Sequence, residues 1–262
     1  MQLYVNLLPY MTRIDHVSEL LERWSGGIEI STDGPHWHDH TDLEKEKQRF
    51  ADHRGPIGVH LPIWELNLAS IQYPELARFS FETYKSFLEW SAAFAGHAVL
   101  HTHLYSTPLF HRQEAQKQSK QYIYELGIIA DKLGIELLIE NIGFHDKMLF
   151  DEDEFVDLFQ EIPNVHALID VGHAHINQWD IPRVIHRLGS KCRALHLHDN
   201  DGISDLHLPV GEGNIDWGPV WECLKQADHD YLAILEYREN TPLEKILADT
   251  DRLTEHLAKE TI

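Results

Sequence analysis

Apolar runs of five to seven residues alternate along the chain with longer stretches in which apolar residues recur at helical spacing. Runs of this length are typical of strands buried on both faces, as in a parallel sheet covered by helices. The longer stretches include residues 73–95 and 113–133, and Gly134 stands where the second of these helices should end. The predicted strands are residues 3–8, 27–31, 57–61, 98–102, 135–141, 166–171, 194–199 and 231–237.

Eight repeats of strand and helix predict an α/β fold, the closed (β/α)8 barrel, built as a single domain over residues 1–262. Barrels of this kind have about 250 residues, so one domain accounts for the length. The alternative is an open doubly wound sheet. In its dinucleotide-binding form that fold carries a glycine-rich turn after the first strand, whereas this chain has Leu8, Pro9 and Tyr10 there.

The chain is strongly acidic, with 43 Asp and Glu against 22 Lys and Arg and a formal net charge of -21. Such a charge opposes binding to phosphate backbones, so we expect no nucleic-acid partner. No apolar run is long enough to cross a membrane, and the first residues lack the pattern of a secretion signal. The two cysteines, Cys192 and Cys223, are far apart in the sequence, as in proteins of a reducing compartment. We therefore expect a cytoplasmic protein without membrane contact.

Histidine is unusually frequent, with 20 residues in the chain, and it is the commonest metal-binding side chain. Residues 32–42 contain His36, His38 and His40. We interpret this segment as a surface loop after the second strand, with a lid over the site as the alternative.

Six successive predicted strands end on a residue that can bind metal. The carboxyl ends of barrel strands meet on one face, which holds the active site in enzymes of this fold. Chance placement is the alternative, because His, Asp and Glu are abundant here. However, a carboxylate at the end of an apolar strand is costly to bury unless a partner such as a cation compensates its charge. We therefore predict metal ligands among His60, His101, Glu140, Asp170, His173, His196 and Glu236. For His60 and His101, direct contact with substrate oxygens is the competing role.

The segment after the seventh strand adds Asp205 and His207 to the metal candidates. His198 follows His196 by two positions and is assigned to the next inward layer, and Asp199 is interpreted as a cap for the following loop. Mixed imidazole and carboxylate donors suit Zn, Mn, Co or Fe better than Ca. We therefore expect one to three divalent ions as the cofactor.

Three motifs carry a family resemblance: IENIG at 139–143, IDVGHAH at 169–175, and HLHDNDG followed by DLHLPVGEGNIDW within 196–217. They resemble the xylose-isomerase-like TIM-barrel superfamily over nearly the whole chain. That superfamily includes sugar isomerases, ketose 3-epimerases, inosose dehydratases and isomerases, and apurinic endonucleases of the endonuclease IV type. The motifs specify the superfamily better than the reaction.

The resemblance implies two possible ligand sets. In the epimerase-like members two glutamates, an aspartate and a histidine hold one divalent metal, and the matching residues are Glu140, Glu236, Asp170 and His196. The resemblance also implies that both glutamates are catalytic, as acid and base. In the endonuclease-like members three zinc ions share nine ligands, which match His60, His101, Glu140, Asp170, His173, His196, Asp205, His207 and Glu236.

The acidic charge and the absence of Arg- or Lys-rich loops at the strand ends oppose a DNA-repair function. The GEGNIDW sequence is also more similar to sugar isomerase and epimerase relatives. We therefore predict a metal-dependent isomerase or epimerase that acts on a sugar or sugar phosphate, removing a proton next to a metal-bound carbonyl. The alternatives are a multinuclear metal hydrolase or phosphodiesterase of the endonuclease IV type, a dehydratase of the inosose type, and a non-catalytic metal-binding module. The sequence does not decide whether the chain forms a homo-oligomer.

Two residues are predicted to contact the substrate. His173 is placed to bind a substrate hydroxyl if it is not a metal ligand. Trp64, just after Pro62 in the loop following the third strand, is placed to cover the apolar face of a sugar, with a packed loop aromatic as the alternative.

Overall fold

Eight parallel strands form a closed barrel in which each strand pairs with its neighbours in chain order, and β8 closes the ring on β1. The computed structural model describes residues 1–33, 47–103, 109 and 111–257. The (β/α)8 prediction is therefore confirmed, while His36, His38 and His40 lie outside the described residues. The strands are β1 (Gln2–Asn6), β2 (Gly27–Ser31), β3 (Ile57–His60), β4 (Ala95–Leu100), β5 (Glu136–Glu140), β6 (His166–Asp170), β7 (Cys192–Leu197) and β8 (Leu232–Leu235).

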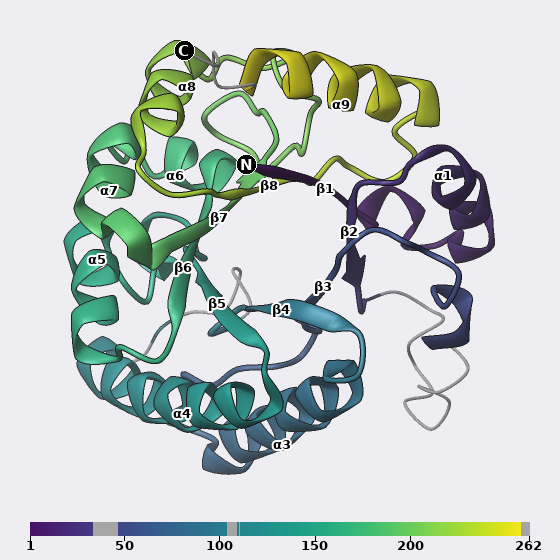
Figure 1. Ribbon diagram of the computed structural model, residues 1–262. Coiled ribbons are helices and arrows are strands. Elements are labelled where there is room, and N and C mark those ends of the chain that lie inside the picture. The colour runs from purple at the N-terminus through teal and green to yellow at the C-terminus, as the bar shows by residue number, and fades with distance from the viewer. Residues whose placement is uncertain (34–46, 104–108, 110, 258–262) are drawn as a thin grey trace.

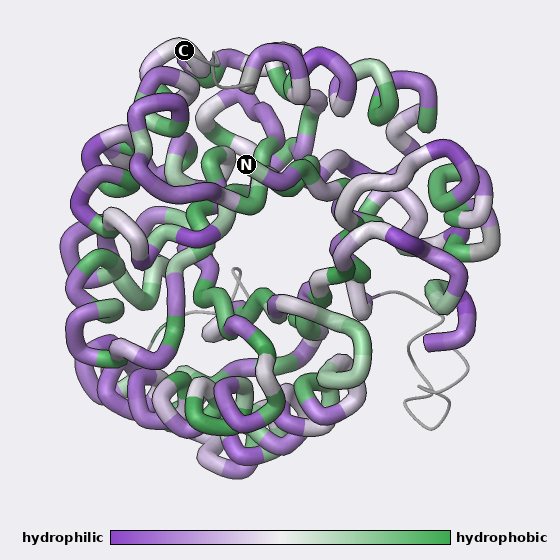
Figure 2. The backbone as a smooth tube through the Cα atoms, in the orientation of Figure 1, coloured by the Kyte–Doolittle hydropathy of each residue, from purple (hydrophilic) through white to green (hydrophobic). Residues whose placement is uncertain are grey.

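Helices ring the outside of the barrel (Figure 1). They are α1 (Val17–Arg23), α3 (Pro74–Ser91), α4 (Arg112–Leu133), α5 (Glu152–Glu161), α6 (Val171–Ile176), α7 (Ile181–Leu188), α8 (Trp217–Gln226) and α9 (Leu243–Leu257). Apolar residues predominate along the strands, whereas polar residues are frequent on the outer helices (Figure 2). None of the described helices has the length and apolar character needed to cross a membrane.

Local sequence signals set several helix ends. α5 begins with a capping box, in which Asp151 and Glu154 each accept a backbone N–H of the other. α4 ends at Leu133 and is capped by Gly134, whose φ of +74° is a conformation that glycine adopts without strain. The prediction for the α3 region was too long at its carboxyl end: the helix stops at Ser91, and β4 begins at Ala95.

The interior of the barrel has two layers of different chemistry. The lower layer is an apolar cluster formed by Tyr4, Val99, Leu138, Leu168, Ala194 and Ile234. Side chains of a strand alternate between its two faces, so the residue two positions later also points inward. Those later residues are polar and buried in every case: Asn6, His101, Glu140, Asp170, His196 and Glu236. The fold thus places a polar ring directly above an apolar base, at the carboxyl ends of the strands.

Candidate metal centre

Four of the predicted ligands converge on one point at the carboxyl end of the barrel. The carboxylates of Glu140, Asp170 and Glu236 face the ring of His196, and all four side chains are buried. The distances from Nδ1 of His196 are 3.1 Å to Oε2 of Glu236, 3.5 Å to Oε2 of Glu140 and 3.7 Å to Oδ2 of Asp170. Nevertheless this buried Nδ1 makes no hydrogen bond. A nitrogen without a hydrogen bond, surrounded by three carboxylates, is the arrangement expected of side chains that bind a cation.

Glu140 connects this group to three further histidines. Its Oε2 lies 2.9 Å from Nε2 of His101 and 3.4 Å from Nε2 of His60. Its Oε1 lies 3.2 Å from Nδ1 of His173. The predicted ligands His60, His101 and His173 therefore gather around one carboxylate.

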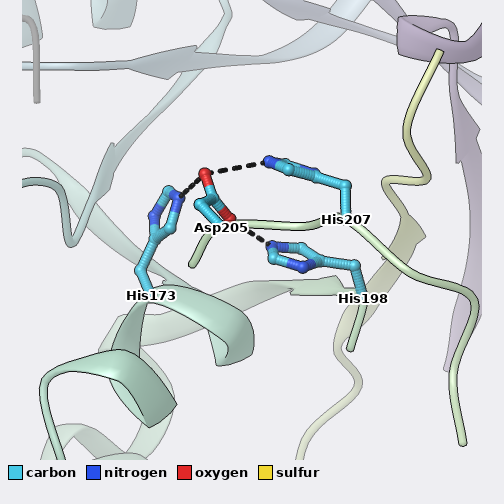
Figure 3. A group of neighbouring side chains, drawn as sticks. All are labelled: His173, His198, Asp205 and His207. Atoms are coloured by element: carbon cyan, nitrogen blue, oxygen red, sulfur yellow. Dashed lines mark hydrogen bonds and ion pairs between the residues drawn. The ribbon is translucent and has the colours of Figure 1, made fainter. Parts of the chain in front are cut away.

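A second group adjoins the first and is formed by His173, His198, Asp205 and His207 (Figure 3). Oδ2 of Asp205 lies 3.3 Å from Nε2 of His173 and 3.2 Å from Nε2 of His207. The rings of His198 and His207 stack with their centroids 4.0 Å apart. His207 has a φ of +45°, which is uncommon for a residue with a side chain.

Backbone carbonyls set the orientation of two of these imidazoles. Nδ1 of His173 lies 3.1 Å from the carbonyl oxygen of Asn141, and Nδ1 of His207 lies 3.0 Å from that of Glu236. A carbonyl oxygen only accepts, so each Nδ1 carries a proton. Each Nε2 lies within hydrogen-bond distance of Oδ2 of Asp205 and donates to it while the ring is protonated. Loss of that second proton leaves each Nε2 with a lone pair beside Asp205, so the second group also has a donor set that fits a divalent metal.

His198 differs from the other members of this group. Its Nε2 lies 3.0 Å from Oδ2 of Asp170 but 3.9 Å from Oδ1 of Asp205. It therefore donates a hydrogen bond to Asp170, a partner of the kind that orients metal-binding carboxylates.

The buried imidazoles and carboxylates shift one another's pKa. Burial alone would lower the pKa of His60, but its hydrogen bond and attraction to Glu140 raise it to about 9. Burial also opposes the charge on His207, yet attraction to Asp205 raises its pKa to about 9. Burial would raise the pKa of Glu140, but attraction to His101 and His196 lowers it well below its usual range. Imidazole protons thus balance the carboxylates, and a metal ion must displace such protons when it binds.

The loop that carries Asp205 and His207 is organised by Asp199, which caps it as expected. Oδ2 of Asp199 accepts the backbone N–H of Gly211 and the indole N–H of Trp217, both at 2.9 Å. Oδ1 accepts the backbone N–H of Ile215 at 3.1 Å and that of Asn200 at 3.0 Å.

Asp199→Asn should destabilise the protein by about 2 to 4 kcal/mol, because either orientation of the amide turns its NH2 group toward two buried N–H donors. Urea denaturation of the metal-free protein measures this loss. Asp201→Asn is the control, since Asp201 is exposed and also accepts two backbone N–H groups. An equal loss in both variants would contradict a special role for Asp199.

Three buried polar residues of the barrel interior were missed by the sequence analysis: Asn6, which belongs to the ring, and Glu29 and His97. Glu29 lies between Ile28 and Ile30 in β2, and a charged residue between two apolar ones in a short strand is the signal that could have revealed it. His97 falls before the predicted start of its strand. Glycines make room for the inner histidines: a Cβ on Gly58 would lie 2.0 Å from Nε2 of His97, and one on Gly172 would lie 2.0 Å from Cε1 of His198.

Trp64 lies apart from these groups in the loop after β3, and 52% of its surface is exposed. Its backbone N–H is 3.5 Å from Oδ1 of Asp33. Its exposed ring does not belong to the packed core, so the suggested role against a sugar stays a prediction.

The family model of the xylose isomerase-like TIM barrel matches residues 25–256. An uncharacterized protein of Methanocaldococcus jannaschii is 23% identical over 170 residues, which are 65% of this chain and 66% of that protein. The fructoselysine 3-epimerase of Escherichia coli O157:H7 is 24% identical over 104 residues, which are 38% of this chain and 37% of the epimerase.

Two solved structures share the fold over nearly their full length. A D-tagatose 3-epimerase-like protein has a TM-score of 0.83 at 22% identity, covering 98% of this chain and 97% of that one. The IOLI protein with a bound zinc atom has a TM-score of 0.77 at 18% identity and full coverage of both chains. Because the family model spans most of the sequence, the chain belongs to the xylose isomerase-like TIM barrel family.

Proposed function

We propose that the protein is a divalent-metal-dependent epimerase or isomerase that moves a proton at a carbon next to the carbonyl of a sugar or sugar phosphate. One observation carries the proposal: the buried Nδ1 of His196 has no hydrogen bond, although three carboxylates lie within 3.7 Å of it. Glu140, Asp170, His196 and Glu236 would hold the metal. When bound, a divalent ion would supply Lewis-acid stabilisation of the negative charge that develops on the substrate's carbonyl oxygen.

Glu140 and Glu236 have the chemistry needed for the proton transfers. They extend from β5 and β8, which are separated around the barrel by two other strands, so they approach a central substrate from different directions. The pKa of Glu236 is lowered, because attraction to His196 outweighs the opposing effect of burial. Both glutamates are therefore carboxylates at neutral pH and can accept a proton. One would remove the substrate proton, and the other would return or relay it.

Two further residues, one in the centre and one in the loop after β3, would bind the substrate. His173 is the candidate for a hydrogen bond to a sugar hydroxyl if it does not bind metal, and Trp64 is the candidate for stacking on the apolar face of the sugar. Support for a sugar substrate comes from the relatives, which include a fructoselysine 3-epimerase and a D-tagatose 3-epimerase-like protein. Support for metal comes from the zinc-bound IOLI structure.

Purified protein should contain bound divalent metal, and with a matching substrate it should introduce solvent deuterium next to the carbonyl carbon. The test incubates ketoses, aldoses and their phosphates in deuterated water and follows the label by NMR spectroscopy. Protein stripped with a chelator is the control, and it should regain exchange when Zn, Mn or Co is returned. Absence of metal by elemental analysis, with no thermal stabilisation by any of the three ions, would contradict the proposal.

The second group of ligands favours a multinuclear metal hydrolase as the second candidate, because His173, Asp205 and His207 can hold an ion next to the first one. Metal stoichiometry and cleavage of a small phosphodiester distinguish the two functions. More than one tightly bound ion together with metal-dependent cleavage would favour the hydrolase. Duplex DNA with an abasic site should bind weakly in either case, since the net charge is -21.

A further inference from the structure

Glu29 lies in the interior of the barrel beside His196, at the ring nitrogen that faces away from the other proposed metal ligands, and is completely buried. Its Oε1 lies 2.9 Å from Nε2 of His196 and 2.7 Å from Nδ2 of Asn6. Its Oε2 lies 3.0 Å from Nε2 of His97. Three nitrogens from β1, β4 and β7 therefore point at one carboxylate of β2, and three N–H donors stabilise the ionised form of a buried carboxylate.

The amide of Asn6 can adopt only one orientation in this network. Its Oδ1 accepts the backbone N–H of Leu8 at 2.8 Å and the hydroxyl of Ser31 at 3.2 Å. Its Nδ2 must then face the carboxylates, and it donates to Oε1 of Glu29 and, at 3.1 Å, to Oε1 of Glu236. Asn6 thus joins Glu29 to a proposed metal ligand and leaves Oε2 of Glu236 directed at His196.

Glu29 also fixes the position of the proton on His196. An ionised carboxylate only accepts hydrogen bonds, so Nε2 of His196 must carry a proton. In the neutral ring that binds metal this is the only N–H, so Nδ1 then presents a lone pair toward Glu140, Asp170 and Glu236. The other tautomer would direct an N–H into the point where the metal is proposed to bind.

We infer that Glu29 is a positioning residue of the metal centre: it holds His196 in the tautomer that binds metal through Nδ1 and, through Asn6, it orients Glu236. This inference rests on the proposed metal-dependent function. His97 supplies the remaining donor to Glu29, and the missing side chain of Gly58 leaves room for the His97 ring. Partners of this kind change metal affinity by about 10- to 100-fold when they are removed.

The test is a calorimetric titration of the metal-free full chain with Zn²⁺ for wild type, Glu29→Gln and Glu29→Leu. We expect about tenfold weaker binding for Glu29→Gln, which keeps one acceptor oxygen but loses the charge, and a loss closer to 100-fold for Glu29→Leu. Glu136→Gln is the matched control, because Glu136 lies on β5 beside Arg193 and His166 at the opposite end of the barrel. It should bind Zn²⁺ like wild type.

A second measurement does not depend on the folding of any variant. In the zinc-loaded wild type, ¹⁵N NMR spectroscopy of the histidine rings should show His196 protonated at Nε2 and unprotonated at Nδ1. Zinc affinity within twofold of wild type in both Glu29 variants, or a zinc-bound Nε2 on His196, would overturn the inference about Glu29 but not the proposed function. Failure of the wild type to bind Zn²⁺ would instead overturn the proposed function.

Discussion

Glu236→Gln, supplied with excess metal, should lose at least about 10²- to 10⁴-fold in turnover, the usual contribution of a general acid or base. Glutamine has nearly the same volume as glutamate but cannot take up the substrate proton. Three of the four proposed ligands remain, so excess metal should still occupy the site. The measurement is the rate of product formation and of solvent deuterium exchange, together with the metal content of the same sample.

Two other variants separate proton transfer from metal binding. Glu140→Gln should behave like Glu236→Gln if both glutamates transfer protons. Asp170→Asn should first lose metal, and excess metal should partly restore its turnover, because Asp170 is proposed only to hold the ion. Near wild-type turnover by metal-loaded Glu236→Gln would show that Glu236 is a structural ligand and that the two-glutamate mechanism is wrong.

The affinity for Zn²⁺ should rise with pH up to about 9, by about tenfold per pH unit for each proton that the metal displaces. The pKa values of His60 and His207 are raised to about 9, and carboxylates raise that of His196 well above its usual range despite burial. Below these pKa values the imidazoles are protonated and compete with the ion. The affinity should therefore fall as the pH falls through 9 and toward 6.

Competition with a chelator of known affinity at several pH values measures this effect. The loss between pH 8 and pH 6 should reach about 100-fold for a single displaced proton. Glu136→Gln is again a suitable control, since it should leave the pH profile unchanged. An affinity independent of pH would show that no histidine of the centre binds the metal.

The repeating pattern of the sequence was sufficient to predict the barrel and most of the candidate site. In β5 to β8 the buried run is apolar up to the inward side chain at the open end, so a polar residue there marks both the strand end and the site. For this reason Glu140, Asp170, His196 and Glu236 were identified from strand boundaries that were only approximately right.

The hydrogen-bond network around Glu29 was not predicted, because its partners meet across the barrel. Glu29 and His196 are 167 positions apart and belong to strands that do not pair. The beginning of β4 was also missed, since Gly96 and His97 interrupt its apolar run. The sequence predicted β2 with its correct bounds despite Glu29 in its middle, but it did not show that Glu29 meets His97 and His196.

Gly58 packs against the ring of His97, and Gly172 packs against that of His198. The residue that each glycine position tolerates therefore depends on the residue at its histidine position. Alanine at position 58 would overlap the ring of His97, and alanine at 172 would overlap that of His198. During evolution, therefore, either glycine could acquire a side chain only after its histidine had been replaced by something smaller. Each glycine and its histidine should be inherited as a pair, and a homologue that has lost one member of a pair should be free to vary at the other.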